Sequence, residues 1–215
     1  MFYFENFYGR KVLKSDYIGE ITAFFTTRED VDYSKLEAER VIQPIQTHSV
    51  NVEFVDNRNE YPDTDGLIIT NKKDAIRLKF ADCTPLIFYD KKQKIAAVSH
   101  AGWRGTAMKI GVETLSKMNS NPKDVIALIG PAIGVCCYEV SEDVKEKLLS
   151  TVQNKKGLYN NRNVDLKQIN AQQLREFGVD KIDICPYCTS CNNDLFYSYR
   201  KENGTNNRHF AVVKL

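Results

Sequence analysis

The sequence lacks the long apolar runs and the runs of basic residues that mark two large classes of protein. No stretch of the 215 residues approaches the roughly 20 consecutive apolar residues that a membrane-spanning helix needs. Lysine and arginine (30 residues) nearly balance aspartate and glutamate (28 residues), and the formal net charge is only +2. We therefore expect neither a membrane nor a nucleic acid as a partner.

The chain also lacks an export signal and the glycine-rich loops that bind nucleotide phosphates. Its first residues, MFYFENFYGRKVLKSD, are aromatic but are interrupted by Glu5, Arg10 and Lys11, without a small-residue cleavage site. Neither G-x-G-x-x-G after a strand nor G-x-x-x-x-G-K occurs. We expect an edge strand at the N-terminus and a cytoplasmic protein.

Cysteine is comparatively frequent, with six residues. In a chain of this size without an export signal, reduced thiols are expected rather than disulfides. Cys185, Cys188 and Cys191 form C-P-Y-C-T-S-C, which resembles part of a zinc or iron–sulfur ligand set. Cys136 or Cys137 could supply a fourth ligand only if the fold allows it. We therefore favour reduced thiols in a tight loop, and whether this loop binds anything stays open.

Hydrophobic patterning predicts a layered α+β fold. Apolar alternation and β-branched or aromatic content predict strands at 19–28, 45–56, 65–70, 75–82, 84–90, 94–100 and 124–130. Helical spacing predicts helices at 33–41, 106–118, 141–152 and 164–178, and residues 194–200 and 208–215 are expected to form a hairpin around Asn203-Gly204. Strands and helices mix without strict βαβ alternation, and no linker interrupts the chain. We expect one domain, residues 1–215.

Two of the three histidines and one cysteine lie at the ends of apolar runs. His48, Cys83 and His100 offer the imidazole nitrogens and thiolate sulfur that zinc prefers. Three protein ligands leave a fourth position for water or substrate, which is typical of a catalytic zinc site, and zinc lowers the pKa of a bound water towards neutrality. The three residues are far apart in the sequence, and a lone histidine in a strand is more often structural. Spacing alone therefore does not establish the site.

Other polar residues near these three could take part in chemistry. Arg104 lies in SHAGWRGT, where Gly102 and Gly105 permit close backbone approach at a strand-to-helix turn. Its guanidinium could bind a phosphate or carboxylate through two parallel hydrogen bonds, or form an ordinary surface ion pair. Asp82 and Asp65 are candidate acid–base groups, although aspartate is also common as a turn or cap residue.

Several of these stretches together resemble one known family. QTHSV, ADCTPLIFYD, SHAGWRGT, IGPAIGVCCYEV and CTSCNNDLFYSYRKENG are similar, in this order, to motifs of the laccase-domain family. That family is also called polyphenol oxidase-like or multi-activity purine nucleoside phosphorylase, and it includes the peptidoglycan editing factor. The resemblance covers residues from Gln46 to Leu215. It implies layered mixed β-sheets flanked by helices, and a zinc ion held by His48, Cys83 and His100.

The resemblance also implies an activity. Family members resemble zinc enzymes that phosphorolyse adenosine, inosine, guanosine and methylthioadenosine and that deaminate adenosine, so purine nucleosides and phosphate are the expected substrates. We expect Cys83, Arg104 and Asp82 to serve catalysis, with Arg104 as the phosphate clamp. FYSYRKENG replaces the more usual F-F-S-Y-R-R-D, which leaves the role of the acidic position, Glu202 here, open.

Three alternatives to the phosphorylase remain at this point. An amidase could use the same zinc site to remove a wrongly added amino acid from a cell-wall precursor. A copper polyphenol oxidase is disfavoured, because three histidines cannot supply the clustered sites of a multicopper oxidase. A binding module stabilised by zinc would need a closed site with four ligands. The sequence does not indicate the oligomeric state.

Overall fold

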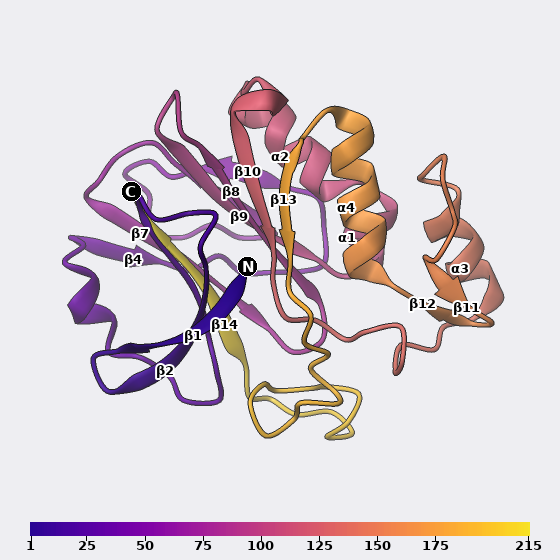
Figure 1. Ribbon diagram of the computed structural model, residues 1–215. Helices are drawn as coiled ribbons and strands as arrows, with labels where there is room; N and C mark the ends of the chain where they lie inside the picture. Colours follow the sequence, from indigo (N-terminus) through magenta and orange to yellow (C-terminus); the bar gives the residue numbers. More distant parts are fainter.

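Two six-stranded β-sheets pack face to face in the computed structural model, which describes residues 1–215 (Figure 1). The first sheet has the strand order β1 (Phe2–Phe7), β2 (Arg10–Ser15), β3 (Thr22–Thr26), β14 (His209–Lys214), β7 (Asp74–Phe80) and β4 (Arg40–Ile42). The second has the order β13 (Lys181–Ile184), β10 (Val125–Ile129), β8 (Thr84–Asp90), β9 (Ile95–Ala101), β6 (Gly66–Ile69) and β5 (Val52–Phe54). Both sheets combine parallel and antiparallel pairs.

Helices form a third layer on the outer face of the second sheet (Figure 1). They are α1 (Trp103–Ala107), α2 (Ile110–Met118) and α4 (Leu166–Phe177), whereas α3 (Glu142–Leu149) lies away from the sheet and packs against α1 in a separate hydrophobic cluster. Two 3₁₀ turns, η1 (Tyr33–Leu36) and η2 (Pro122–Asp124), and a short hairpin of β11 (Tyr159–Asn160) and β12 (Asn163–Val164) complete the elements. The expected α+β class, with layered mixed sheets flanked by helices, is confirmed.

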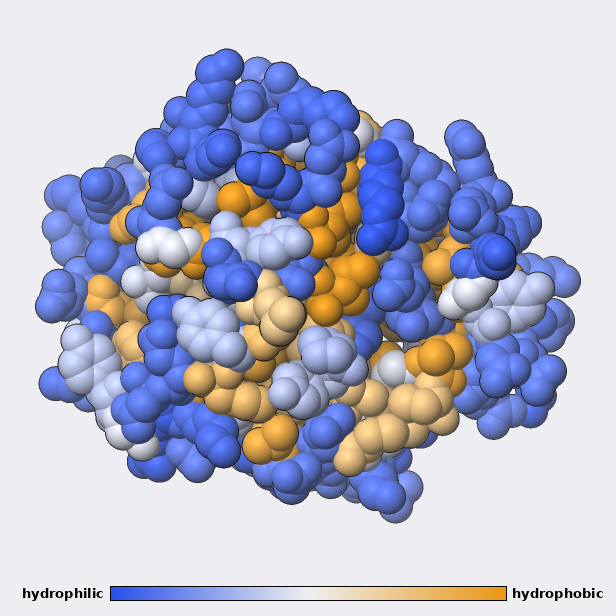
Figure 2. Space-filling model, in the orientation of Figure 1, coloured by the Kyte–Doolittle hydropathy of each residue, from blue (hydrophilic) through white to orange (hydrophobic).

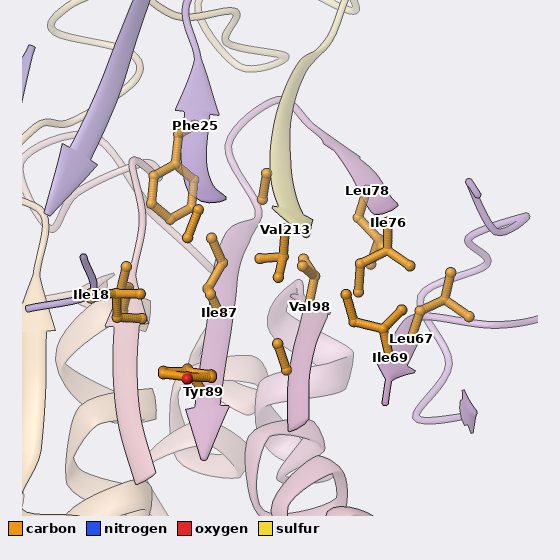
Figure 3. Packing of buried hydrophobic residues seen from close by; sticks show 14 of the residues in the cluster. Ile18, Phe25, Leu67, Ile69, Ile76, Leu78, Ile87, Tyr89, Val98 and Val213 are labelled. Atoms are coloured by element: carbon orange, nitrogen blue, oxygen red, sulfur yellow. The ribbon is translucent and has the colours of Figure 1, made fainter. Parts of the chain in front are cut away.

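Alternating side chains divide the interior into separate hydrophobic layers. Leu67 and Ile69 of β6 belong to the cluster between the sheets, whereas Ile68 belongs to the cluster that packs against α2 and α4. Successive side chains of a strand point to opposite faces, so an apolar run such as GLII is buried on both faces. Figure 3 shows Leu67 and Ile69 beside Ile76 and Leu78 of β7, from the other sheet.

The surface is mostly hydrophilic around the rim of the face drawn in Figure 2, and hydrophobic residues gather towards its centre. None of the four helices has the length and apolar content required to cross a membrane. The longest, α4, has 12 residues and ends at Gly178, whose φ of 112° closes the helix in the left-handed conformation expected of a C-terminal glycine.

The prediction of a C-terminal hairpin is wrong. Residues 194–200 form turns, and β14 instead pairs with β3 on one side and β7 on the other. Phe196 and Ser198 are fully buried, so their alternation with partly exposed neighbours reflects a loop packed on the core rather than a strand. Local periodicity cannot distinguish these two cases.

The prediction of a helix at 33–41 is also wrong. The chain makes only the turn η1, leaves it at Glu37 with a φ of 53°, and then forms β4 parallel to β7. The helix expected at 106–118 is present but is divided into α1 and α2 at Lys109, which has a φ of 58°. In both places a left-handed residue interrupts the helical pattern, and sequence periodicity does not report this.

Candidate metal centre and its cavity

The three expected metal ligands come from three separate loops or strand ends that meet at one end of the two sheets. His48 lies in the loop between β4 and β5, and Cys83 lies in the turn by which the chain passes from β7 of the first sheet to β8 of the second. His100 is near the end of β9, directly opposite Pro85 of β8 in the ladder. Strand pairing therefore places His100 close to Cys83.

The ligand atoms of the three residues all lie within 4.8 Å of one another. Cys83 Sγ is 3.8 Å from His48 Nε2, and the two imidazole rings have their centroids 4.8 Å apart. A β-carbon at Gly102 would lie 3.1 Å from both Cys83 Sγ and His48 Cδ2, so a larger residue there would require these two side chains to shift. The donor set and its compactness fit a single metal ion with one open position.

The side chain of Asp65 contacts both His100 and the loop that carries His48. Its carboxylate is fully buried and accepts a hydrogen bond of 2.7 Å from His100 Nδ1. It also accepts hydrogen bonds from the backbone N–H groups of Thr47, His48 and Ser49, and these bonds hold the loop against the carboxylate. Because Nδ1 of His100 is engaged by the carboxylate, Nε2 is the nitrogen available to a metal.

The electrostatics of the centre favour a thiolate. Burial alone would raise the pKa of Cys83, but the imidazoles of His100 and His48 hold that pKa below its usual range. Burial would likewise raise the pKa of Asp65, and the hydrogen bonds from His100 and the loop backbone outweigh it and lower the pKa. The lowered pKa favours the thiolate form of Cys83, which is the form that binds metals.

The backbone is strained at two positions of the centre. His48 has a φ of 65° and Asp82 a φ of 82°, values that residues other than glycine seldom adopt. Such conformations persist only where the surrounding contacts impose them, and they concentrate at functional sites. Here the hydrogen bonds to Asp65 hold the His48 loop, and the contacts of Asp82 hold the turn before Cys83.

The centre opens into a cavity of about 520 Å³. His48 is exposed at its mouth, whereas His100 is 4% exposed at its base. Three cationic side chains line the cavity: Lys79, Arg200 and Arg208. A cavity of this volume is in the range of small-molecule sites, and its cations suit an anionic substrate.

Asp82 lines the cavity, but both oxygens of its carboxylate are occupied. Oδ1 accepts a hydrogen bond of 2.6 Å from the Thr189 hydroxyl, and Oδ2 accepts one of 2.7 Å from the Arg200 backbone N–H. These contacts fasten the loop that carries Arg200 against the turn before Cys83. The expected role of Asp82 in acid–base catalysis stays a prediction.

Arg104 is exposed at the start of α1, with its guanidinium carbon 4.6 Å from the centre of the Trp103 ring, and it is not among the residues that line the cavity. Burial and the Cys83 charge raise the pKa of Tyr138 in the cavity wall, and the charges of Arg200 and Arg104 oppose this rise. The expected role of Arg104 as the phosphate clamp stays a prediction.

Sequence reasoning missed most of the cavity wall. Gln46 binds the backbone of Lys79 through both side-chain atoms, at 2.9 and 3.0 Å, and so ties the His48 loop to β7. Glu202 accepts hydrogen bonds from Arg28, Asn193 and the Ser198 backbone, which gives the open acidic position a role in holding its loop. Arg200 lies in FYSYR, so the motif itself could have drawn attention to it.

The fold and the centre together define a protein of two packed sheets with a potential His-Cys-His metal site in a small-molecule cavity. A family model described as multi-copper polyphenol oxidoreductase laccase matches residues 26–215. The chain therefore belongs to this laccase-like family. The match begins earlier in the chain than the motifs alone suggested.

Curated relatives and solved structures agree with this assignment. Purine nucleoside phosphorylase YlmD of Bacillus subtilis is 34% identical over 192 residues, which is 78% of this chain and 68% of that protein. Purine nucleoside phosphorylase SERP0752 of Staphylococcus epidermidis is 34% identical over 189 residues, covering 79% of this chain and 71% of that protein. The crystal structure of YlmD from Geobacillus stearothermophilus superposes with a TM-score of 0.86 at 26% identity and covers 98% of each chain.

Proposed function

We propose that this protein is a zinc-dependent purine nucleoside phosphorylase that acts in the cytoplasm on adenosine, inosine, guanosine and methylthioadenosine, and that it also deaminates adenosine. The observation that carries the proposal is the convergence of His48, Cys83 and His100 within 4.8 Å in a cavity lined by cations. The printed names of the curated relatives support the phosphorylase activity.

Zinc is the metal that we assign to the centre. Two imidazoles and one thiolate with an open fourth position are a ligand set of catalytic zinc, and a zinc ion there would supply Lewis acidity. Copper also binds two histidines and a cysteine in electron-transfer sites, but three histidines in the whole chain cannot supply a multicopper cluster. Metal analysis of the purified protein distinguishes the two ions.

The side chains of the cavity would bind and orient the substrates. Phosphorolysis needs a phosphate beside the ribose and an environment that stabilises the cationic sugar as the purine leaves. Arg200 and Arg208 offer charged donors for the phosphate, and Arg104, which does not itself line the cavity, is the proposed third. Tyr138, with its pKa raised by burial, stays neutral and presents a hydroxyl and an aromatic face to a purine.

The test is an assay of adenosine with and without phosphate. We expect adenine release that requires phosphate, and inosine formation that does not. Cys83→Ala should abolish both activities together with zinc binding at the centre, while Cys185→Ala, which alters a buried cysteine outside it, should retain them. Turnover by metal-free Cys83→Ala protein would contradict the proposal, and amino-acid release from a cell-wall precursor without nucleoside turnover would favour the amidase.

A further inference from the structure

A second group of potential metal ligands lies outside the centre described above. The thiols of Cys136, Cys137, Cys188 and Cys191 all lie within 4.8 Å of one another. The fold brings them together because β10 and β13 are parallel neighbours, with Ile129 opposite Ile184. The loops that leave the carboxyl ends of these two strands therefore emerge side by side.

Backbone contacts hold the two loops in register. Cys185 N–H donates to the Ile129 carbonyl at 2.8 Å, Thr189 N–H donates to the Ala132 carbonyl at 3.1 Å, and Ala132 pairs with Cys188 in a parallel bridge. Lys167, only 6% exposed, donates to the carbonyls of Cys185 and Tyr187. The loops that carry the cysteines are therefore held in place by hydrogen bonds to each other and to Lys167.

The sulfur geometry fits one tetrahedral ion. Cys191 Sγ lies 3.5 Å from Cys136 Sγ and 3.4 Å from Cys137 Sγ. Tetrahedral zinc with Zn–S bonds of about 2.3 Å places neighbouring sulfurs about 3.8 Å apart. A polynuclear iron–sulfur cluster would need wider spacing, because the cluster itself lies between the sulfurs.

The surroundings of the four thiols also fit a metal site. Gly134 N–H donates to Cys188 Sγ at 3.2 Å, and a hydrogen bond of this kind stabilises a thiolate. A β-carbon at Gly134 would lie 3.2 Å from Cys188 Cβ and 3.3 Å from Cys136 Sγ, so a larger residue there would require these cysteines to shift. A disulfide is a poorer fit, because Cys191 Sγ faces two partner thiols at nearly equal distance.

We propose that Cys136, Cys137, Cys188 and Cys191 form a second, structural site for one Zn²⁺ with four thiolate ligands. The site has no open position, so it holds the loops together and takes no part in turnover. The loops that it joins also carry Ile133, Tyr138, Tyr199 and Arg200, which form much of the cavity wall. The ion therefore holds the two loops, and with them this part of the cavity wall, in place whether or not substrate is bound.

Metal counting tests this site without reference to activity. We expect about two zinc ions per chain in protein purified without chelators, about one in Cys83→Ala, and about one in the double variant Cys188→Ala/Cys191→Ala. Cys185→Ala is the matched control, because it removes a thiol of the same loop that is outside the group, and it should keep both ions. A single zinc that is lost entirely in Cys83→Ala would overturn the proposal.

Thiol alkylation of the unaltered protein provides a test that does not depend on variant folding. Zn²⁺ should protect all four cysteines from iodoacetamide, and a chelator should make them reactive at least about 10-fold faster. Equal reactivity with and without Zn²⁺, or a disulfide from Cys191 to Cys136 or Cys137 in peptide maps, would overturn the site. Iron in place of zinc would overturn the identity of the ion.

Discussion

His100 Nδ1 lies 2.7 Å from Asp65 Oδ1, and both side chains are almost completely excluded from solvent. The contact fixes the histidine ring with Nε2 towards Cys83 and His48. Asp65 was one of two candidate acid–base groups in the sequence, and that role stays a prediction. Its contact with His100 also suits a positioning residue that would act on a metal through His100.

Replacing Asp65 tests this role. Asp65→Asn should weaken metal binding at the centre about 10- to 100-fold, because the carboxylate both orients His100 and increases its basicity. Competition with a chromophoric chelator measures the affinity. Asp63→Asn is the matched control, since Asp63 contacts Thr47 and Asn51 in the same region but not His100, and it should leave the affinity unchanged. Equal affinities for the two variants would contradict the role.

Asp82→Asn separates positioning from proton transfer at the cavity. Both carboxylate oxygens accept hydrogen bonds, so we expect the variant to raise the nucleoside KM about 10-fold through loss of a charged hydrogen bond, with the pH profile of kcat unchanged. Thr189→Val removes one partner of the same contact and should have a similar effect. If Asp82→Asn, but not Thr189→Val, loses the acidic limb of the pH profile of kcat, the result would instead support a role of Asp82 in catalysis.

Arg104 and Arg200 should determine phosphate binding. We expect Arg104→Ala and Arg200→Ala each to raise the phosphate KM about 10-fold or more, with a smaller effect on the nucleoside KM, because a charged donor to phosphate is worth about 1.5–3 kcal/mol. Initial rates at varied phosphate measure this. Arg175→Ala, on the exposed face of α4, is the control and should leave both constants unchanged. An unchanged phosphate KM in Arg104→Ala would remove this residue from the proposed clamp.

His209 should make stability depend on pH. Burial lowers its pKa to about 3, and the nearby Pro131 carbonyl offsets this only in part, at a geometry too poor for a hydrogen bond. Between an unfolded pKa of about 6.5 and the folded value, the unfolded chain binds the proton and the folded protein does not. Stability contributed by neutral His209 is therefore present above that window and is lost as the pH falls through it.

A matched substitution isolates this contribution. His209→Leu removes two unpaired ring nitrogens that lie between Phe80 and Phe196, and it should raise the free energy of unfolding by about 1–3 kcal/mol at pH 7. The difference from the unaltered protein should grow by up to about 1.4 kcal/mol per pH unit below pH 6.5. Urea unfolding at pH 7 and pH 5 measures it, and a difference that is constant with pH would contradict the assignment.

The sequence predicts the layered class and most of the strands, because the apolar residues of each strand are buried on one or both faces of its sheet. In β8, for example, Leu86 and Phe88 pack under the helices and Ile87 and Tyr89 pack between the sheets. It does not predict the partners of β14, because pairing with β3 and β7 depends on residues far away in the chain. The parallel pairing of β10 with β13, which gathers four cysteines, was hidden for the same reason.

The candidate site was predicted through the motifs rather than through periodicity. His48, Cys83 and His100 follow from their donor atoms and from the family resemblance, and the structure brings them together as expected. The role of Asp65 depends on hydrogen bonds from a loop 16 to 18 residues earlier in the chain, which no local pattern reports. Lys79 and Arg208 were not singled out from the sequence, because no local motif places them at the one cavity that both line.

The central place of β14 has a consequence for how the chain is made. Until residues 209–214 leave the ribosome, β3 and β7 each present an unpaired edge, so the first sheet exists only as two separate halves. The turn that carries Cys83 begins where β7 ends, and β7 lacks a neighbour on that side for the whole of this period. The turn that carries Cys83 therefore lacks this support until β14 is inserted, and a ribosome stalled before His209 would hold a chain with two open strand edges that are prone to pair with other strands.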